Sequence, residues 1–341
     1  TTEGMGISGT DASVCSVCMS GYFSADTTTC SICPAGSYPS KTITIASAAK
    51  NWFFVTSSPD FVKLAAAERI TGYLNVSADS GVTWSALVDA GQRHWISIAC
   101  SPDFVIMVAA GRGGNLYRSD DSGASWTALT SAGSENWIGV AVSPDVKMIL
   151  AVVNGGSGYM TRSNDGGSTW NTVTGAGSKD WYGVTASPDF MKMAATVPGG
   201  NIYLSVDSGV TWGVMGGSVS GTLYVQIVAS ADFTKMAVAV ANSILQYSDD
   251  SGATFTDMAS GSKNWVGITA NPDFTKMMAS VQSGGKLYQS DDSGASWTSD
   301  GSIDDAVALT GGATGASFCP AGMYSAEGAS SCTLCATGTY S

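Results

Sequence analysis

Apolar and polar residues alternate along the chain in short segments that are separated by turn residues. In residues 137–142 the alternation has a period of two, and Ser143-Pro144-Asp145 then turns the chain. Residues 147–153 form a nearly continuous apolar run, which is typical of a strand buried on both faces. Two short segments, 159–162 and 170–173, complete a unit that predicts four strands in succession.

The four-strand unit recurs six times, because three motifs return together every ~43 residues. An octet Ser-x-Asp-x-Gly-x-Ser/Thr-Trp ends at Trp84, Trp126, Trp170, Trp212 and Trp297, and a sixth copy ends at Phe255. A turn similar to Ser-Pro-Asp-Phe occupies 58–61, 101–104, 143–146, 187–190, 230–233 and 271–274, and an aromatic residue precedes each turn. Four strands per repeat without a helical period predict an all-β chain that folds as a six-bladed β-propeller.

Each octet supplies the residues of a tight turn. Its Asp can accept hydrogen bonds from backbone N–H groups, its Gly can adopt a positive φ, and its Trp can pack between strands. The octet resembles the Asp-box, or bacterial neuraminidase repeat, of sialidases and sortilin-type propellers, and the resemblance covers residues 42–310. The resemblance implies a structural role for six carboxylates: Asp79, Asp121, Asp165, Asp207, Asp250 and Asp292.

A closed propeller must join its first and last blades, or it leaves an exposed sheet edge. Residues 42–47 alternate cleanly and precede Trp52 by the offset expected of a fourth strand. We therefore expect 42–47 to supply the outer strand of the last blade, where residues 298–301 make a poor strand. Residues 306–310 fall where a seventh unit would begin, so a seven-bladed ring is the alternative.

The two ends of the chain have the composition of a different module, with paired Cys-x2-Cys spacings and Cys-Pro-x-Gly-x-Tyr-Ser segments. These segments are similar to the ephrin-receptor-like cysteine-rich repeat of large extracellular proteins. Disulfides are expected for Cys18 with Cys30 and for Cys319 with Cys332, whose spacings nearly agree. A crossed pairing that uses Cys15 and Cys33, or zinc binding, is the alternative.

The predicted domains are a cysteine-rich module over 1–41, a propeller over 42–310 and a truncated cysteine-rich repeat over 311–341. Both ends break off within a repeat, which suggests a section of a longer polypeptide. Cys100 lies in a predicted first strand, and we interpret it as a buried thiol that acts as a small apolar residue. A disulfide with an unpaired cysteine such as Cys33 is the alternative.

Composition narrows the classes of partner. A net charge of −12 argues against nucleic acid and anionic lipid, and the sequence lacks the apolar run that a membrane-spanning helix needs. Charged residues make up only 12% of the chain, whereas Ser and Thr make up about a quarter. A hydroxyl-rich surface suits O-glycosylation or packing against neighbours, so we expect a secreted or cell-surface protein.

The residues expected of a sialidase active site are missing. The nearest match to its Arg-Ile-Pro motif, Glu68-Arg69-Ile70-Thr71, lacks the proline. The single histidine, His94, leaves little room for histidine catalysis or a multi-histidine metal site. We therefore expect no catalytic residue, no metal and no cofactor, and a sialidase-like glycoside hydrolase is only the third hypothesis.

Four cations precede a repeat aromatic residue by two positions: Lys50, Arg93, Lys179 and Lys263. In a closed ring they would surround one mouth of the channel, near His94, and could bind an anionic glycan. The alternative is that they are solvated loop charges. Asn75-Val76-Ser77 is an N-glycosylation sequon, which makes Asn75 a candidate glycosylation site.

These observations favour a non-enzymatic extracellular structural protein that self-associates, as a protomer of a cell-surface coat, fibre or flagellar-hair type filament. The alternative hypothesis is an adhesion module that binds glycan or protein.

Overall fold

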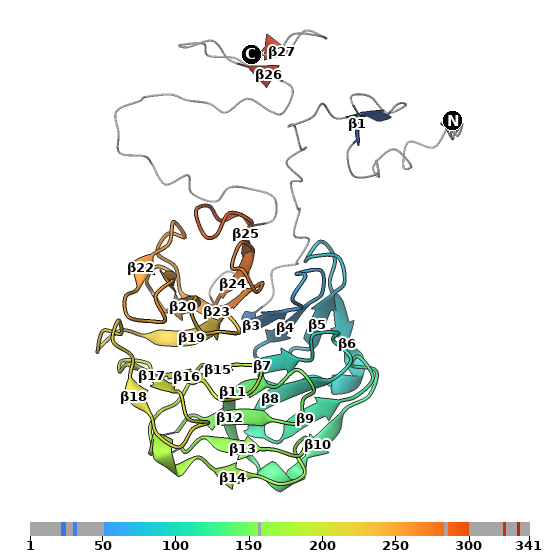
Figure 1. Ribbon diagram of the computed structural model, residues 1–341. Helices are drawn as coiled ribbons and strands as arrows, with labels where there is room; N and C mark the ends of the chain where they lie inside the picture. Colours follow the sequence, from blue (N-terminus) through green and yellow to red (C-terminus); the bar gives the residue numbers. More distant parts are fainter. Residues whose placement is uncertain are drawn as a thin grey trace, which may run out of the picture. The chain divides into compact units, whose positions relative to one another are not determined.

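Six antiparallel blades, called blades 1 to 6 here, follow one another along the chain in the computed structural model (Figure 1), and pairing of β8 with β11 joins blades 2 and 3 into one sheet. The structure describes residues 22–24, 30–32, 51–155, 158–282, 286–299, 323–324 and 333–334. Blade 1 holds β3 (Trp52–Ser57), β4 (Leu64–Glu68), β5 (Leu74–Ser77) and β6 (Ser85–Leu87). Blade 2 holds β7 (Trp95–Cys100), β8 (Met107–Gly114), β9 (Leu116–Ser119) and β10 (Thr127–Leu129). Blade 3 holds β11 (Glu135–Val142), β12 (Ile149–Val153), β13 (Thr161–Ser163) and β14 (Asn171–Thr172).

The remaining blades repeat this order. Blade 4 holds β15 (Val184–Ala186), β16 (Met193–Thr196), β17 (Ile202–Ser205) and β18 (Gly213–Val214). Blade 5 holds β19 (Tyr224–Ala229), β20 (Met236–Val240), β21 (Gln246–Ser248) and β22 (Thr256–Asp257). Blade 6 holds β23 (Trp265–Ala270), β24 (Met277–Val281) and β25 (Leu287–Ser290). Short 3-10 turns follow the outer strands of three blades: η1 (Val88–Ala90), η2 (Thr130–Ala132) and η3 (Thr174–Ala176).

Outside the propeller, the structure describes two short pairs of antiparallel strands. Strand β1 (Tyr22–Ser24) pairs with β2 (Cys30–Ile32), and β26 (Met323–Tyr324) pairs with β27 (Thr333–Leu334). The expected disulfides and the cysteine-rich domain boundaries lie outside the described side chains, so they stay predictions. No helix in the part of the chain that the structure describes is long and apolar enough to cross a membrane.

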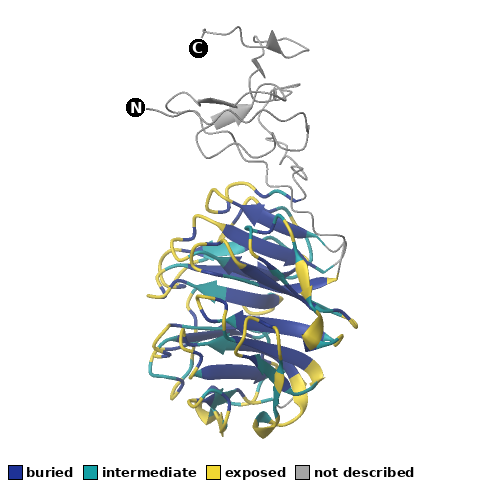
Figure 2. Cartoon of the chain, turned by 90° about the vertical axis from the view of Figure 1, so that its right-hand side faces the viewer, coloured by how far each residue is buried: buried dark blue, intermediate teal, exposed yellow. Residues whose placement is uncertain are grey.

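The first strand of each blade lines a common central cavity, which places the six blades around one axis. Residues from β3, β7, β11, β15, β19 and β23 all contribute to the wall of this cavity. Buried residues form the inner strands, and exposed residues lie in the connecting loops and the outer strands (Figure 2). Glycine allows close approach where inner strands meet: a Cβ on Gly183 would lie 2.5 Å from the carbonyl oxygen of Val225 in the next blade.

Blade 6 packs directly against blade 1 and so closes the ring. The hydroxyl oxygens of Ser57 and Thr269 are 2.9 Å apart, and the hydroxyl of Ser280 donates to the carbonyl of Phe53 at 3.0 Å. Consecutive blades are linked elsewhere by lysine side chains, because the Nζ atoms of Lys63, Lys192 and Lys235 donate to carbonyl oxygens in the first turn of the following blade: Asp103, Asp232 and Asp273.

The all-β propeller prediction is confirmed. Of residues 298–301, expected to make a poor strand, Thr298 forms one isolated bridge with Gln289 and belongs to no strand. The proposed closing strand 42–47 and the possible seventh unit at 306–310 lie outside the described residues, so the blade count of the whole chain stays a prediction.

Candidate functional site

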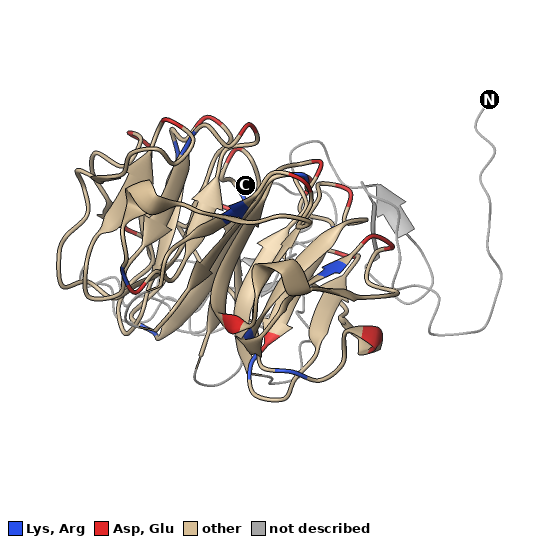
Figure 3. Cartoon of the chain, turned by 90° about the horizontal axis from the view of Figure 1, so that it is seen from below, with Lys and Arg blue, Asp and Glu red and all other residues tan. Residues whose placement is uncertain are grey.

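One face of the ring, called the octet face here, consists of turns that satisfy their own polar groups. In blade 2, Asp121 accepts hydrogen bonds from Ser119 Oγ, Ser125 N and Ser125 Oγ at 2.8, 2.8 and 2.6 Å. The amide of Ser122 donates to the carbonyl of Val105 in the Pro-Asp-Phe turn, so both turns share this face. Figure 3 shows many of the acidic residues in such a row of turns. Their carboxylates are occupied by structural bonds.

The same geometry recurs at each octet Asp: Asp79, Asp121, Asp165, Asp207, Asp250 and Asp292. Hydrogen bonds, with the Thr169 hydroxyl first, lower the pKa of Asp165 to about 2. A carboxylate held this way stabilises the turn in its ionised form.

The cations predicted to bind a ligand lie against aromatic rings of their own blades. The Arg93 guanidinium carbon is 4.4 Å from the ring centroid of Tyr117, and the Nζ of Lys179 is 5.1 Å from that of Tyr203. Lys263 has the same relation to Tyr288, at 5.1 Å. Lys50 lies outside the described residues. This placement favours cation–π stacking within each blade, and a role in glycan binding stays a prediction for these residues.

The sequon asparagine Asn75 is 1% exposed, and its Nδ2 donates to the carbonyl of Tyr73 at 2.9 Å. It occupies the inward position that Tyr117 and Tyr203 fill in blades 2 and 4. The glycosylation prediction is therefore not supported by the folded structure, because a glycan needs an accessible amide.

The opposite face, called the hairpin face here, carries the β-hairpins between second and third strands and the loops between blades. At this end the central channel is closed by the residue that follows each repeat aromatic: Phe53, Ile96, Ile138, Tyr182, Val225 and Val266. In five blades the strand register shifts at this residue, as in β7 between Trp95 and Ser97. A β-bulge re-aims its extra side chain, which explains how these residues meet at the axis.

A cluster of cationic and aromatic groups lies on this apolar plug. The guanidinium carbon of Arg69 is 5.0 Å from the ring centroid of Phe53, and Arg69 Nε donates to His94 Nε2 at 3.1 Å. The Arg112 amide donates to the His94 carbonyl at 3.0 Å, which fixes Arg112 beside the histidine. We call Arg69, His94, Arg112 and Tyr182 the mouth cluster.

The electrostatics of the mouth cluster are those of an anion site. Burial, with the charges of Arg69 and Arg112, lowers the pKa of His94, so the imidazole is neutral and accepts from Arg69. Burial raises the pKa of Tyr182, while the same two arginines act in the opposite direction. Among the described residues, no carboxylate lies within ion-pair distance of Arg69 or Arg112. Two guanidinium groups and a phenol are thus available to an anion.

The hairpin that carries Arg69 is strained. Its two central residues, Ile70 and Thr71, both have positive φ values, of 67° and 53°. A β-branched residue rarely adopts this conformation, and backbone strain concentrates at functional sites. Ile70 is also 64% exposed, so burial of its side chain does not explain the strained turn.

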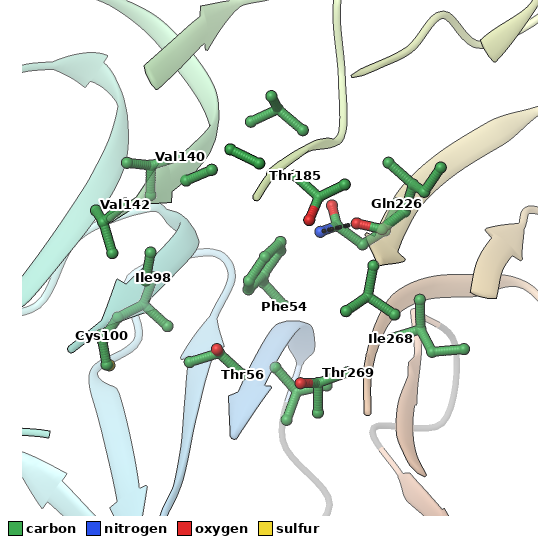
Figure 4. Close-up of a pocket in the computed structure, with 17 residues that line it drawn as sticks. Phe54, Thr56, Ile98, Cys100, Val140, Val142, Thr185, Gln226, Ile268 and Thr269 are labelled. Atoms are coloured by element: carbon green, nitrogen blue, oxygen red, sulfur yellow. Dashed lines mark hydrogen bonds between the residues drawn. The ribbon is translucent and has the colours of Figure 1, made fainter. Parts of the chain in front are cut away.

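Below the plug, the central cavity has a volume of about 150 Å³, and both polar and apolar groups form its wall (Figure 4). Cys100 contributes to this wall, and burial raises the pKa of its thiol well above the usual value. This agrees with the interpretation of Cys100 as a small apolar residue. Gln226 donates to its neighbour's carbonyl at 3.3 Å and also lines the cavity. No group of three or more potential metal ligands occurs among the described residues.

Comparison with solved structures identifies the class of protein. A gluconolactonase from Xanthomonas campestris aligns over 72% of this chain and 87% of its own, with a TM-score of 0.58 and 14% identity. A chain of the nidogen–laminin complex aligns over 69% of this chain and 91% of its own, with a TM-score of 0.59 and 11% identity. The chain is a β-propeller protein.

A xyloglucanase of glycoside hydrolase family 74, also from Xanthomonas campestris, aligns over 74% of this chain with a TM-score of 0.52 and 18% identity. The chain covers 46% of that enzyme, less than half of its length. No family model and no curated protein matches the sequence.

The expectation that the chain is not an enzyme is contradicted by its structural neighbours. A xyloglucanase and a gluconolactonase share this fold, so a propeller of this kind does not exclude catalysis. Identities of 14–18% show the fold alone and assign no reaction.

Proposed function

We propose that the propeller is a ligand-binding module of an extracellular or cell-surface protein, and that it binds an anionic group of a glycan or protein at the mouth cluster. The observation that carries this proposal is the pair Arg69 and Arg112, which flank a neutral His94 without a carboxylate partner among the described residues. The ligand anion would provide the missing charge. The hydroxyl-rich, weakly charged composition supports an extracellular location.

The geometry of the cluster favours a carboxylate or sulfate. The Nε of Arg69 is occupied by His94, which leaves its two terminal nitrogens for a bidentate contact. In the plug beneath, the Phe53 and Tyr182 rings are 6.3 Å apart; Phe53 is buried under Arg69, so the half-buried Tyr182 is the ring that the ligand can reach. A few polar groups above an apolar surface are typical of a small-ligand site.

Calorimetric titration with trigalacturonate, a heparin-derived tetrasaccharide and neutral maltotriose tests this proposal. We expect an acidic saccharide to bind, and we expect Arg69→Ala and Arg112→Ala each to weaken binding roughly tenfold, since a hydrogen bond to a charged group contributes about 1.5–3 kcal/mol. Arg93→Ala and Lys179→Ala test the cations that the sequence suggested as ligands, and Lys147→Ala, on the octet face, is the control that should retain affinity. Equal binding of maltotriose, or loss of affinity only in Arg93→Ala and Lys179→Ala, would refute the mouth cluster as the site.

A second candidate function, self-association into a coat or filament, is supported by the surface of blade 4. Val206, Val214 and Val219 are 60%, 56% and 63% exposed there. The position of Val206 is Asp120, Asn164, Asp249 or Asp291 in four other octets and Ala78 in the fifth. Val214 lies in the uncharged outer strand β18, whose exposed edge is available to pair with a second copy.

Sedimentation velocity over a range of protein concentrations measures this association. We expect oligomers that dissociate in Val206→Asp and Val214→Lys, with Val88→Asp as a control because Val88 is equally exposed (62%) on blade 1. A monomer at every concentration would exclude self-association through these valines.

A further inference from the structure

The junction between blades 3 and 4 contains a groove of about 290 Å³ at the octet face. At the junctions of blades 1 with 2, 2 with 3, 4 with 5 and 5 with 6, a long side chain at the end of the outer strand or just after it packs against the octet glycine of the next blade: Leu87, Leu129, Met215 and Met258. Val173 takes this position between blades 3 and 4, opposite Gly209. Because valine is shorter than leucine or methionine, it fills less of this junction than the longer side chains fill of theirs.

An arginine without an acidic partner lies in the same groove. The Nε of Arg162 donates to Asn164 Oδ1 at 2.7 Å, and its two terminal nitrogens donate to the carbonyl of Ser208 at 3.0 Å and to Met148 Sδ at 3.5 Å. In the preceding repeat, Arg118 instead forms an ion pair with Asp120 at 2.7 Å. Asn164 thus replaces the acid, and no described carboxylate lies within ion-pair distance of Arg162. Burial lowers the pKa of Arg162, so a nearby anion would stabilise the charged form of its guanidinium.

Two departures from the repeat therefore coincide at one junction: a shortened packing residue and a missing carboxylate. Other residues of the groove suit a sugar. Asn171, Thr172 and Thr174 provide amide and hydroxyl groups, and Val210, which is 70% exposed, provides an apolar wall. Sugar rings combine hydroxyl groups with an apolar C–H face, and an acidic sugar adds the charge that Arg162 lacks.

We propose that this groove binds an acidic saccharide, with the carboxylate or sulfate of one sugar residue on Arg162 and its hydroxyl groups on Asn171 and Thr172. The site is separate from the mouth cluster and does not depend on it. Arg118 cannot act in the same way, because Asp120 neutralises it and Leu129 fills its junction.

The test uses the full chain with Arg69→Ala and Arg112→Ala, so that the mouth cluster is silent. We expect this protein to bind trigalacturonate or a heparin-derived tetrasaccharide, and the two probes distinguish carboxylate from sulfate recognition. Asn164→Asp, which recreates the Arg118–Asp120 pair, should weaken binding at least tenfold without loss of thermal stability. Val173→Leu, which closes the groove, should have the same effect. Asp120→Asn is the matched control and should leave affinity unchanged, since Leu129 still closes that junction.

Absence of binding in the mouth-silenced protein would overturn the groove site, whatever the intact chain binds. Unchanged affinity in both Asn164→Asp and Val173→Leu would also overturn it, as would equal affinity for maltotriose. Binding that survives silencing of the mouth cluster and is lost in these two variants would support it, even if the mouth cluster itself proves inactive.

Discussion

Replacement of Trp181 by alanine is expected to lower the free energy of unfolding by about 3–5 kcal/mol. Trp181 is fully buried in blade 4, where its ring lies edge-on to Tyr203 at 5.3 Å between centroids and 6.0 Å from Trp212. Its Nε1 also donates to the carbonyl of Gly177 at 3.3 Å. Alanine would leave a cavity between these rings and an unpaired carbonyl. The loss is a large part of the ~5–15 kcal/mol that stabilises a typical domain.

Urea unfolding followed by circular dichroism measures this loss. Trp181→Phe is the control, because it keeps an aromatic ring and removes the N–H donor, and its expected cost is only about 1–2 kcal/mol. A cost below ~1 kcal/mol for Trp181→Ala would show that the blade core relaxes around the missing ring.

Acidification from pH 4 towards pH 2 is expected to unfold the propeller. Twelve Asp carboxylates of the octet and Pro-Asp-Phe turns have a pKa below the usual 3.8. Hydrogen bonds are the largest cause in ten of them, and in Asp79 and Asp292 they outweigh burial, which acts in the opposite direction. The pKa falls to about 2 in Asp165, Asp232 and Asp250.

The direction in which stability changes with pH follows from the number of protons bound by the folded and unfolded chains. Below pH 4 the unfolded chain binds protons that the folded turns exclude, so the stabilisation present above pH 4 is lost as the pH falls. His94, whose pKa is lowered from 6.5, adds a smaller loss that begins below pH 6.5. Thermal melts at pH 7, 5, 4, 3 and 2 should show a steep fall only below pH 4, with an uptake of several protons on unfolding. Asp165→Asn should reduce this uptake by about one proton. A melting temperature that is constant down to pH 2 would contradict the expectation.

The propeller could be predicted from sequence because the repeat specifies it locally. The octet contains its own hydrogen-bond acceptor, positive-φ glycine and aromatic residue, so the turn at Asp121 forms from neighbours in the chain. The turn phenylalanines were harder to anticipate, since Phe104 and Phe190 adopt positive φ values of 62° and 55° while their rings are buried.

The mouth cluster could not be predicted in the same way, because it depends on bulges and on contacts between blades. Arg69 was considered only as a failed sialidase motif, although Arg69 and Arg112 lie in corresponding hairpins of the first two repeats. The other four repeats have no arginine at this position, and this difference between repeats was the available signal. Alignment of the repeats would also have placed Asn75 opposite Tyr117 and shown that it faces inward.

The lysine bonds between blades have a consequence for synthesis of the chain. Each runs forward, from Lys63 in blade 1, Lys192 in blade 4 and Lys235 in blade 5 to a turn that is made later. Chains fold from the N-terminus as they leave the ribosome, so each donor is already in place when its acceptor emerges. In the contacts that close the ring, by contrast, Ser57 and Phe53 of blade 1 are made first and their partners in blade 6 are made last. Translation must therefore reach the last repeat before the nascent ring can shut, and until then blade 1 exposes an apolar flank that a chaperone could recognise.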